Sequence, residues 1–373
     1  MANRNKNMTV LQLLPDLNVG GVERGTIEIA TALVNAGHRG LVISNHGRLV
    51  AELEAAGAVH YDLPIGRKSL ATLGLVRKVR RIMLEQKVDI VHARSRLPAW
   101  IGRFALRGIP PSKRPRWITT VHGPYSVNRY SEVMASGEKV IAISEFIRDY
   151  VLNNYPRVNA EKLTVVHRGV DIERYTPSFK PSTSWMKEFQ GADFYDPDKK
   201  ILIFPGRLTR WKGQADFLAL VGSLISTGQK VCGLIVGAQS DAKSQFEREL
   251  KQDVSKRGLE EHIHFLGERH DLRELFSQAD ISYSLPNVPE AFGRTTLEAL
   301  SLGTPVIGYD NGGTGEILRH LFPAGLVAPG NVNEVAAKTR QFLTSEPAVP
   351  ENHTMTSQNM QRETLAAYQS MLN

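Results

Sequence analysis

Short apolar runs alternate with segments of helical period along almost the whole chain, and no other feature restricts its possible folds as much. Runs typical of buried strands occur at residues 10–14, 41–44, 90–92, 117–121, 140–143, 201–204, 233–236, 263–266, 281–284 and 305–308. Segments with apolar residues three or four positions apart lie between many of them, at residues 22–35, 50–56, 73–86, 214–227, 272–278, 295–302 and 332–343. Strands that alternate with helices on this scale predict parallel sheets covered by helices. We therefore expect an α/β protein.

One interruption of this alternation predicts a domain boundary. Residues 177–200 contain three prolines among serines and mixed charges, which is typical of a connection between domains. A chain of 373 residues also suggests two domains of ordinary size. We expect an N-terminal domain over residues 1–180, a linker over 181–198, a C-terminal domain over 199–345, and a tail over 346–373 whose final helix, near 362–372, packs back toward the N-terminal domain.

Several classes of protein are excluded by composition. No apolar run reaches the roughly 18 residues that would span a bilayer. The single cysteine, Cys232, rules out an internal disulfide framework and a cysteine-based metal cluster, and it suggests a reducing compartment. The triplet Asp196-Pro197-Asp198 falls in the expected linker, so we predict a turn there and no metal site.

Positive charge is concentrated in the first half of the chain. Residues 1–180 carry 27 Lys and Arg against 15 Asp and Glu, whereas the remainder carries 19 against 23. A basic half of this kind attracts an anionic partner, which could be nucleic acid, an anionic membrane surface or an acidic substrate. Charge alone does not choose among the three, and a solvated basic face without any partner remains an alternative.

A first candidate site lies in residues 289–300, between a predicted strand and a predicted helix. Glu290 precedes the helix and Glu298 falls in its first turns. A loop at the carboxyl end of a strand is where open α/β sheets bind ligands. The backbone N–H groups of Ala291, Phe292 and Gly293 are expected to face the ligand beside the positive end of the helix, which suits phosphate oxygens.

A second candidate site lies in residues 204–213, which again join a strand to a helix. Gly206 permits a sharp turn, Arg207 can hold a phosphate with two hydrogen bonds, and Lys212 adds a point charge beside it. Two cations at this position suit the stabilisation of a departing nucleoside diphosphate without a metal ion. Two solvated cations beside an exposed Trp211 are the alternative interpretation.

Taken in order, these motifs resemble those of the family 4 glycosyltransferases. The resemblance covers about residues 8 to 345. It rests on the glycine-rich loop Asn18-Val19-Gly20-Gly21-Val22-Glu23, on Thr120-Val121-His122-Gly123, on Gly169-Val170-Asp171, on Gly-Arg-Leu-x-x-x-Lys-Gly at 206–213, on Glu-x7-Glu at 290–298, and on Gly312-Gly313-x-x-Glu316. It implies the GT-B fold, in which two Rossmann-like domains with parallel sheets face a central cleft. Arg168 and Ala291 depart from the family pattern, which often has asparagine and glycine there.

The resemblance also implies a role for each matched residue. Arg207 and Lys212 bind the diphosphate of the donor, Glu290 meets hydroxyls of the donor sugar, and Glu298 meets the ribose. Gly20 and Gly21 let the N-terminal loop approach the donor and the acceptor, and His122 lies near the reacting face of the sugar. We expect His122, Arg207, Lys212 and Glu290 to be the catalytic group.

Members of this family retain the anomeric configuration and do not require a metal, so we expect neither a metal nor another cofactor here. The expected reaction moves a hexose or N-acetylhexosamine from a nucleoside-diphosphate sugar to a hydroxyl group. UDP is the favoured nucleotide and GDP is possible. Positive charge develops on the sugar and negative charge on the leaving diphosphate, and the cations and helix amides are expected to stabilise the latter.

The basic half is expected to bind the acceptor, an anionic glycan or glycolipid of the lipopolysaccharide type. Cations beside apolar residues form a basic amphipathic segment that suits anionic lipid, and we assign the acceptor or membrane contact to Arg77, Lys78, Arg80, Arg81, Arg94 and Arg96. The expected location is cytoplasmic, on the inner face of the cytoplasmic membrane.

Two other functions compete with this one. Basic residues interleaved with aromatic ones also suit nucleic acid, but the sequence has no recognisable nucleic-acid motif and we expect no such partner. A GT-B-type sugar-nucleotide epimerase or hydrolase shares the expected fold, and it would consume the sugar nucleotide without an acceptor.

Overall fold

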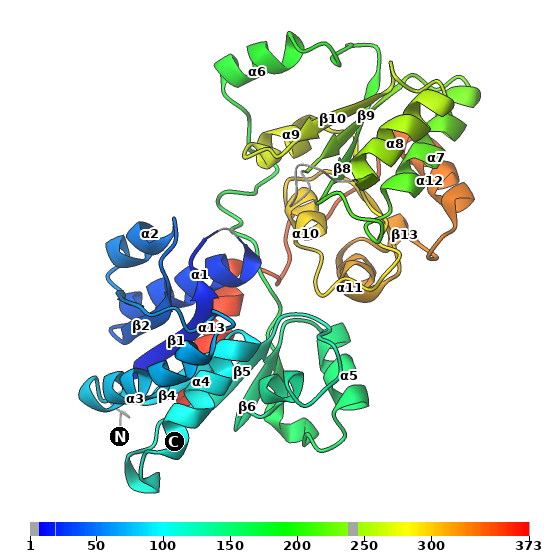
Figure 1. Ribbon diagram of the computed structural model, residues 1–373. Coiled ribbons are helices and arrows are strands. Elements are labelled where there is room, and N and C mark those ends of the chain that lie inside the picture. The colour runs from blue at the N-terminus through cyan, green and yellow to red at the C-terminus, as the bar shows by residue number, and fades with distance from the viewer. Residues whose placement is uncertain (1–6, 19, 238–244, 373) are drawn as a thin grey trace. The chain divides into compact units, whose positions relative to one another are not determined.

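The computed structural model describes residues 7–18, 20–237 and 245–372 (Figure 1). The chain divides into two compact units. The first joins Met1–His167 to Ser357–Asn373, and the second comprises Arg168–Thr356. Each unit contains one parallel sheet with helices packed on it.

The first unit contains a seven-stranded sheet in the order β3-β2-β1-β4-β5-β6-β7. Its strands are β1 (Thr9–Asp16), β2 (Arg39–Asn45), β3 (Val59–Asp62), β4 (Ile90–Ala93), β5 (Arg116–Val121), β6 (Lys139–Ala142) and β7 (Leu163–Val165). Its helices are α1 (Gly21–Asn35), α2 (Val50–Ala55), α3 (Leu75–Glu85), α4 (Arg96–Arg107), α5 (Glu145–Asn154) and α13 (Ser357–Gln369), with short 3₁₀ helices η1 (Leu70–Gly74), η2 (Pro111–Lys113), η3 (Ser131–Ala135) and η4 (Ala160–Lys162).

The C-terminal helix α13 completes the core of the first unit. Its Met360, Ala367 and Tyr368 pack with Met8, Val10 and other buried residues of the sheet and of α1. The Tyr368 hydroxyl lies 2.7 Å from His92 Nδ1, and His92 Nε2 lies 2.6 Å from the Thr120 hydroxyl. This buried chain of hydrogen bonds joins α13 to β4 and β5, so a segment that is distant in sequence holds the middle of the sheet.

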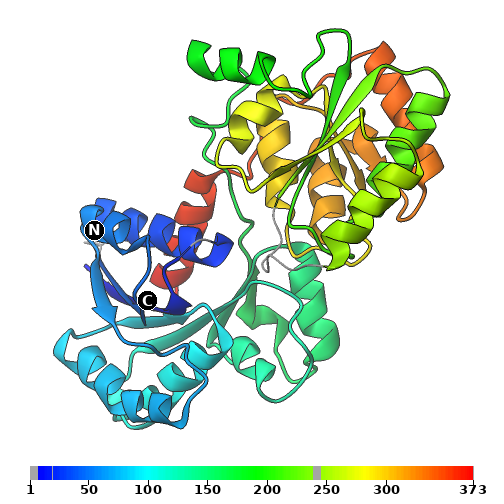
Figure 2. The same cartoon turned by 45° about the horizontal axis from the view of Figure 1, so that its top comes forward.

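A six-stranded parallel sheet in the order β10-β9-β8-β11-β12-β13 forms the second unit. Its strands are β8 (Lys200–Pro205), β9 (Val231–Val236), β10 (Ile263–Gly267), β11 (Ile281–Ser284), β12 (Val306–Tyr309) and β13 (Leu326–Val327). Its helices are α6 (Thr183–Gln190), α7 (Gln214–Ser226), α8 (Gln245–Lys256), α9 (Leu272–Gln278), α10 (Arg294–Ser301), α11 (Gly312–Leu321) and α12 (Val332–Thr344), with a 3₁₀ helix η5 (Pro323–Gly325). Helices cover both faces of this sheet (Figure 2).

Both sheets have a point at which the strand order reverses. The strand order reverses between β1 and β4 in the first sheet, and between β8 and β11 in the second. At such a reversal the loops that follow the two neighbouring strands diverge, and they leave a crevice at the carboxyl ends of the strands. The loops after β8 and β11 are the two candidate sites of the second unit.

Parts of the sequence-based division into elements differ from the structure. Helix α4 was not predicted, because Pro98 and several arginines obscure its period; Pro98 lies in the first turn, where the missing N–H has no intrahelical partner to lose. The residues expected to form the linker contain α6, whose Trp185 indole donates a hydrogen bond of 2.6 Å to Asp271 of the same unit. The unit boundary falls at residue 168 rather than at 180.

Among the described residues, no helix is both long and apolar enough to cross a membrane. The sole cysteine of the sequence, Cys232, is buried in β9, and burial raises the pKa of its thiol to about 11.

Candidate active site

The loop after β8 is shaped by two glycines with positive φ. Gly206 has φ 144° and Gly213, at the start of α7, has φ 92°. A Cβ at Gly213 would lie 1.9 Å from the backbone oxygen of Leu285, so only glycine lets this loop pass so close to β11. The close passage is secured by the backbone N–H of Asn287, which donates to the carbonyl of Trp211 over 2.8 Å. The two candidate loops are therefore held against each other.

Lys212 and Glu290 form an ion pair between these loops. Lys212 Nζ lies 2.5 Å from Glu290 Oε1, and the two side chains are only 14% and 18% exposed. Partial removal from water strengthens the attraction between the charges. The ammonium group also lies 4.7 Å from the centre of the Trp211 ring, which adds a cation–π contact. The ion pair, its low exposure and the cation–π contact together fix the position of the Lys212 ammonium group at the reversal point of the second sheet.

The other oxygen of Glu290 is oriented by α11. Thr314 is fully buried and its hydroxyl lies 3.4 Å from Glu290 Oε2 and 3.1 Å from the Ser284 hydroxyl. The Glu290 carbonyl accepts a hydrogen bond of 2.7 Å from the N–H of Gly313. A Cβ at Gly313 would come within 2.3 Å of the backbone of Phe292, so the glycine allows α11 to abut the turn that carries Glu290.

The turn formed by Ala291, Phe292 and Gly293 leads directly into α10. Gly293 has φ 95° and precedes the first residue of the helix, and Phe292 is buried at 5% exposure. Within α10, the Arg294 guanidinium donates to Glu298 over 2.8 Å, and Glu298 is buried at 7% exposure. Glu298 thus lies buried within the unit as the fifth residue of α10.

Arg207 occupies the same loop as Lys212 but differs from it in environment. Its side chain is exposed, whereas its carbonyl accepts a hydrogen bond of 3.0 Å from the side chain of the buried Gln214. The backbone of the loop is therefore fixed while the guanidinium stays accessible to a ligand.

Sequence reasoning missed three residues that support this site. Gln214 holds the loop, Trp211 underlies the ammonium group, and Thr314 orients the carboxylate. Trp211 entered the sequence analysis only in the alternative interpretation, as an exposed residue. Thr314 lies in the Gly-Gly-x-x-Glu motif, and its role depends on a contact across 24 residues that no local pattern indicates.

The glycine-rich loop and His122 lie at the same kind of edge in the first unit. Gly20 has extended backbone at the start of α1 and its carbonyl accepts from the N–H of Arg24 over 3.0 Å; Gly21 is the first residue of α1, and Val19 lies outside the described residues. The half-buried His122 follows β5, and its backbone N–H donates to the Tyr125 hydroxyl over 3.3 Å.

Three of the six cations predicted to meet the acceptor or the membrane are engaged within the protein. Arg94 is 4% exposed and donates to Gln12 over 2.9 Å. Arg80 caps the end of α4, donating to the carbonyl of Ala105 over 3.0 Å. Arg96 lies 5.0 Å from the centre of the Tyr125 ring.

The remaining three cations, Arg77, Lys78 and Arg81, are exposed on α3. The assignment of Arg94 to an outside surface was wrong, because a local charge pattern does not show which guanidinium the tertiary packing buries. Arg80 is partly buried, and its assignment stays a prediction.

The triplet Asp196-Pro197-Asp198 forms the predicted turn, in which the Asp196 carboxylate accepts from the N–H of Asp198 over 3.0 Å. Within the described ranges, no group of three or more His, Cys, Asp or Glu side chains is placed to hold a metal ion.

Two family profiles match the chain in succession. A profile described as Glycosyltransferase Family 4 matches residues 19–174, and one described as Glycosyl transferases group 1 matches residues 187–362. Together they follow the division into two units, and the second includes both loops of the Lys212–Glu290 site.

The chain belongs to the family 4 glycosyltransferases.

Solved structures of similar proteins agree with this family assignment. The chain is similar to a glycosyltransferase from Rickettsia africae, with 26% identity, a TM-score of 0.86 and coverage of 98% of this chain and 99% of that one. HepE of Anabaena, crystallised in complex with UDP-glucose, superposes with a TM-score of 0.79 at 23% identity, over 97% of this chain and all of that one. The predicted GT-B fold and the predicted transferase class are confirmed.

One curated relative of this family 4 glycosyltransferase is more similar in sequence over a shorter stretch. The lipopolysaccharide core biosynthesis mannosyltransferase LpsB of Rhizobium meliloti is 31% identical over 155 residues, which are 42% of each chain. The match therefore covers less than half the length of either protein.

Proposed function

We propose that this enzyme transfers a hexose or N-acetylhexosamine, with retention of configuration and without a metal ion, from a UDP-sugar to a hydroxyl of a lipopolysaccharide- or glycolipid-type acceptor. The observation that carries the proposal is the ion pair between Lys212 and Glu290 at the reversal point of the second sheet. The pair brings a cation that suits a diphosphate and a carboxylate that suits sugar hydroxyls within 2.5 Å of each other, which supports the binding of a sugar nucleotide here.

The loop after β8 stabilises the leaving diphosphate in this proposal. Negative charge grows on its oxygens as the bond to the anomeric carbon breaks. Lys212 is already placed and partly desolvated by Trp211 and Glu290, so it can stabilise that charge without large rearrangement. The exposed Arg207 guanidinium supplies a second, more adaptable contact.

Glu290 contributes to the sugar side of the reaction. When Lys212 turns its charge toward the diphosphate, the carboxylate retains Thr314 as a partner and has an oxygen available to accept from sugar hydroxyls. Retention then follows if the acceptor attacks on the face from which the diphosphate leaves and a donor phosphate oxygen takes the acceptor proton. No protein carboxylate is required as the nucleophile in this scheme.

UDP is favoured over GDP as the nucleotide. The residues proposed to bind the diphosphate do not distinguish one base from another. HepE, whose fold this chain shares, was crystallised with UDP-glucose. The acceptor class is supported by the match to a lipopolysaccharide core mannosyltransferase and by the positive charge of the first 180 residues.

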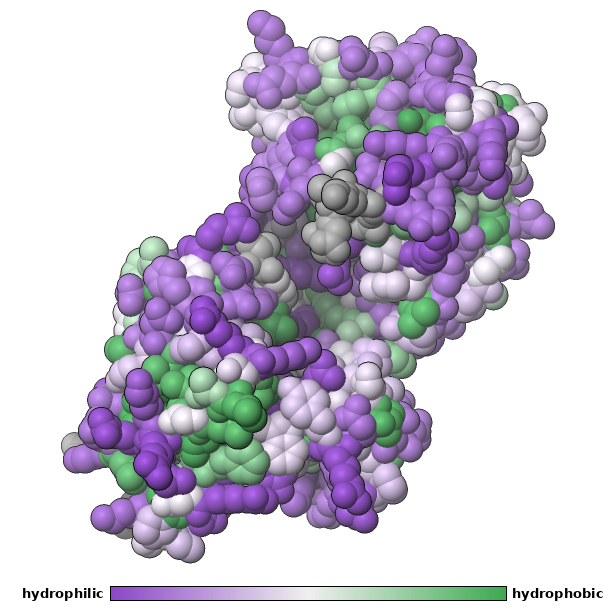
Figure 3. Space-filling model, viewed as in Figure 1, coloured by the Kyte–Doolittle hydropathy of each residue, from purple (hydrophilic) through white to green (hydrophobic). Residues whose placement is uncertain are grey.

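A peripheral contact with the inner face of the cytoplasmic membrane is part of the proposal. Leu70 and Leu73 in η1 are 87% and 52% exposed, and the exposed Arg77, Lys78 and Arg81 follow in α3. In the region of α3, hydrophilic and hydrophobic residues lie side by side on the surface (Figure 3). Exposed leucines beside cations suit insertion between anionic headgroups.

Calorimetric titration of the full chain with UDP, GDP and ADP, in the presence of a chelator, tests the donor site. We expect UDP to bind most tightly and the Lys212→Ala variant to lose that binding. A requirement for added divalent metal would contradict the metal-free reaction. Tight binding of GDP or ADP instead would change the donor class but keep the site.

The type of reaction is tested separately with the UDP-sugar that binds. Incubation without an acceptor should leave it intact, and consumption under those conditions would favour the epimerase or hydrolase. With a glycolipid acceptor, NMR of the product should show the anomeric configuration of the donor; an inverted product would rule out the retaining scheme.

A further inference from the structure

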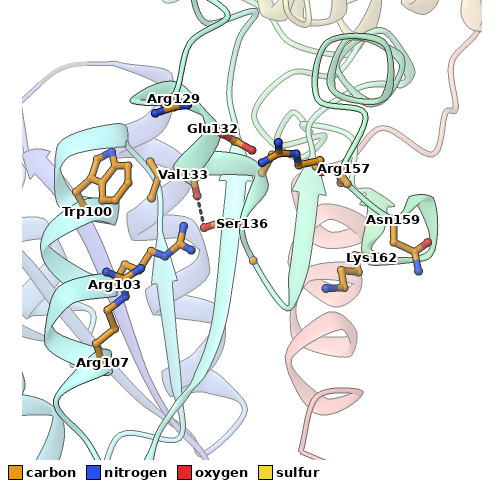
Figure 4. Close-up of a pocket in the computed structure, with 13 residues that line it drawn as sticks. Trp100, Arg103, Arg107, Arg129, Glu132, Val133, Ser136, Arg157, Asn159 and Lys162 are labelled. Atoms are coloured by element: carbon orange, nitrogen blue, oxygen red, sulfur yellow. Dashed lines mark hydrogen bonds between the residues drawn. The ribbon is translucent and has the colours of Figure 1, made fainter.

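The first unit contains a cavity of about 390 Å³ that lies on its flank (Figure 4). It is bounded by α4, by the segment from η3 to the start of β6, and by the segment from the end of α5 to η4. All of its lining residues lie between positions 100 and 162, so the cavity belongs to one unit alone and none of the residues of the donor site contributes to it.

Five cations line this cavity: Arg103, Arg107, Arg129, Arg157 and Lys162. Figure 4 shows the side chains of Arg103 and Arg157 reaching into the space from opposite sides. In the part of the chain that the structure describes, none of the five takes part in an ion pair within 4.0 Å.

Arginines elsewhere on the surface behave differently. The guanidinium groups of Arg24, Arg210 and Arg257 lie 2.6, 2.6 and 3.0 Å from carboxylates. Five cations that share one concavity without such partners repel one another and raise the local positive potential, and a bound anion relieves that repulsion. The cavity is therefore built for a negatively charged ligand.

Its remaining walls suit a sugar ring. The Trp100 indole donates a hydrogen bond of 2.9 Å to the carbonyl of Tyr130, which fixes the ring, and the Arg103 guanidinium lies 5.8 Å from the ring centre. Glu132 is the one carboxylate in the lining, and it can accept from hydroxyl groups but repels phosphate. A ligand with both hydroxyls and an anionic group can interact with Glu132 through the hydroxyls and with the cations through the anionic group.

We propose that this cavity binds a monosaccharide unit carrying a phosphate or carboxylate group. The volume is near the lower end of the range for small-molecule sites, about 300–1,000 Å³, so it suits one such unit rather than a polymer. Three small residues, Ala135, Ser136 and Gly137, also line the cavity. A Cβ at Gly137 would lie 2.2 Å from the carbonyl of Lys139, so this part of the lining requires glycine at position 137.

The binding itself does not depend on the proposed transferase reaction, but its purpose rests on that reaction: an acidic sugar of the acceptor held here would anchor the acceptor on the first unit. The two statements can therefore fail separately, and the experiment is designed to tell their failures apart.

Calorimetry of the full chain at low salt tests the site with defined probes. Glucose 6-phosphate and glucuronate serve as acidic sugars, glucose as the neutral sugar and inorganic phosphate as the anion without a sugar. We expect both acidic sugars to bind, glucose not to bind, and phosphate to bind at least tenfold more weakly than glucose 6-phosphate. An Arg103→Gln/Arg157→Gln variant should lose at least tenfold in affinity, because each guanidinium supplies charge-assisted hydrogen bonds.

Two further variants provide the controls. Lys113→Gln/Lys256→Gln removes the same charge from exposed positions outside the cavity and should leave affinity unchanged. Lys212→Ala should also retain it, which separates this site from the donor diphosphate site. Circular dichroism of each variant checks that it folds.

The proposal is overturned if the acidic sugars do not bind, or if phosphate binds as well as glucose 6-phosphate. It is also overturned if the double variant loses binding to phosphatidylglycerol vesicles rather than to sugars, since the cations would then serve a lipid surface. UDP binding with no acidic-sugar binding refutes this site alone, whereas the reverse result refutes the proposed donor and keeps the site.

Discussion

At the reversal point of the second sheet, the loops are joined by a largely buried ion pair, Lys212 with Glu290. At the reversal point of the first sheet, Arg94 follows β4 and is more deeply buried, yet its polar side-chain partner is the neutral amide of Gln12. Burial lowers the pKa of the Arg94 guanidinium. Among the described residues no carboxylate lies within ion-pair distance of it.

The same difference separates the cavity beside α4 from other cations on the surface. Arg210 and Arg257 of the second unit and Arg24 of the first are paired with carboxylates, whereas the cations around the cavity are not. The charge of Lys212 is balanced until a ligand exchanges with one member of its pair. The charge around the cavity is left unbalanced, which favours permanent attraction of an anionic partner.

The largest effect is expected from Lys212→Ala. Removing a preorganised charge that stabilises a transition state costs about 10²–10³ in rate, so the rate of UDP release in the presence of acceptor should fall by that amount. Lys256→Ala, an exposed change on α8, should leave the rate unchanged. A loss of less than tenfold in Lys212→Ala would mean that the pair is structural.

Glu290→Gln tests the other half of the pair through stability. It leaves the ammonium of Lys212 partly buried beside a neutral amide, so the free energy of unfolding should fall by about 1–3 kcal/mol. Urea unfolding measures the change. Combining Glu290→Gln with Lys212→Met should recover part of the loss, because no unpaired charge remains; an additive loss would show that the two side chains do not interact.

His92 provides a pH test of the first unit. Burial, and then the positive charge of Arg94, hold the pKa of His92 well below its ordinary value of 6.5. The unfolded chain then binds a proton that the folded chain does not, so the free energy of unfolding should fall as pH drops below 6.5. The loss is up to about 1.4 kcal/mol per pH unit until the folded-state pKa is reached.

Urea unfolding between pH 7 and pH 5 measures this dependence. The comparison is His92→Gln, which removes the titrating group and keeps hydrogen-bonding capacity toward Tyr368 and Thr120. An equal slope in the variant would assign the acid sensitivity to other histidines.

The smallest effect is expected from single substitutions of two arginines of α3, which should differ in their effects on lipid binding and on stability. Arg77 is exposed, whereas Arg80 donates to the last turn of α4. Arg77→Gln should weaken binding to phosphatidylglycerol vesicles by about 1 kcal/mol, roughly fivefold, as measured by flotation. Arg80→Gln should lower the melting temperature more than it lowers lipid binding; the opposite pattern would place Arg80 at the lipid surface.

Much of the fold was accessible from local patterns. Period-2 and period-3.6 apolar spacing indicated most strands and helices, because each reflects the face that one element buries. Helix α4 was missed where Pro98 interrupts the period. The last helix begins at Ser357, five residues before its predicted start, because its first three residues are polar and show no apolar period.

The sequence by itself determined the α/β class, the two parallel sheets and the loops that carry the donor site, because strand, turn and helix signals are local. Tertiary structure alone decided which charges meet and which are enclosed. Lys212 and Glu290 are 78 residues apart, and His92 meets Tyr368 across 276 residues. Such contacts depend on the order in which strands assemble and on which helix covers them, and neither is encoded in the spacing of neighbouring residues.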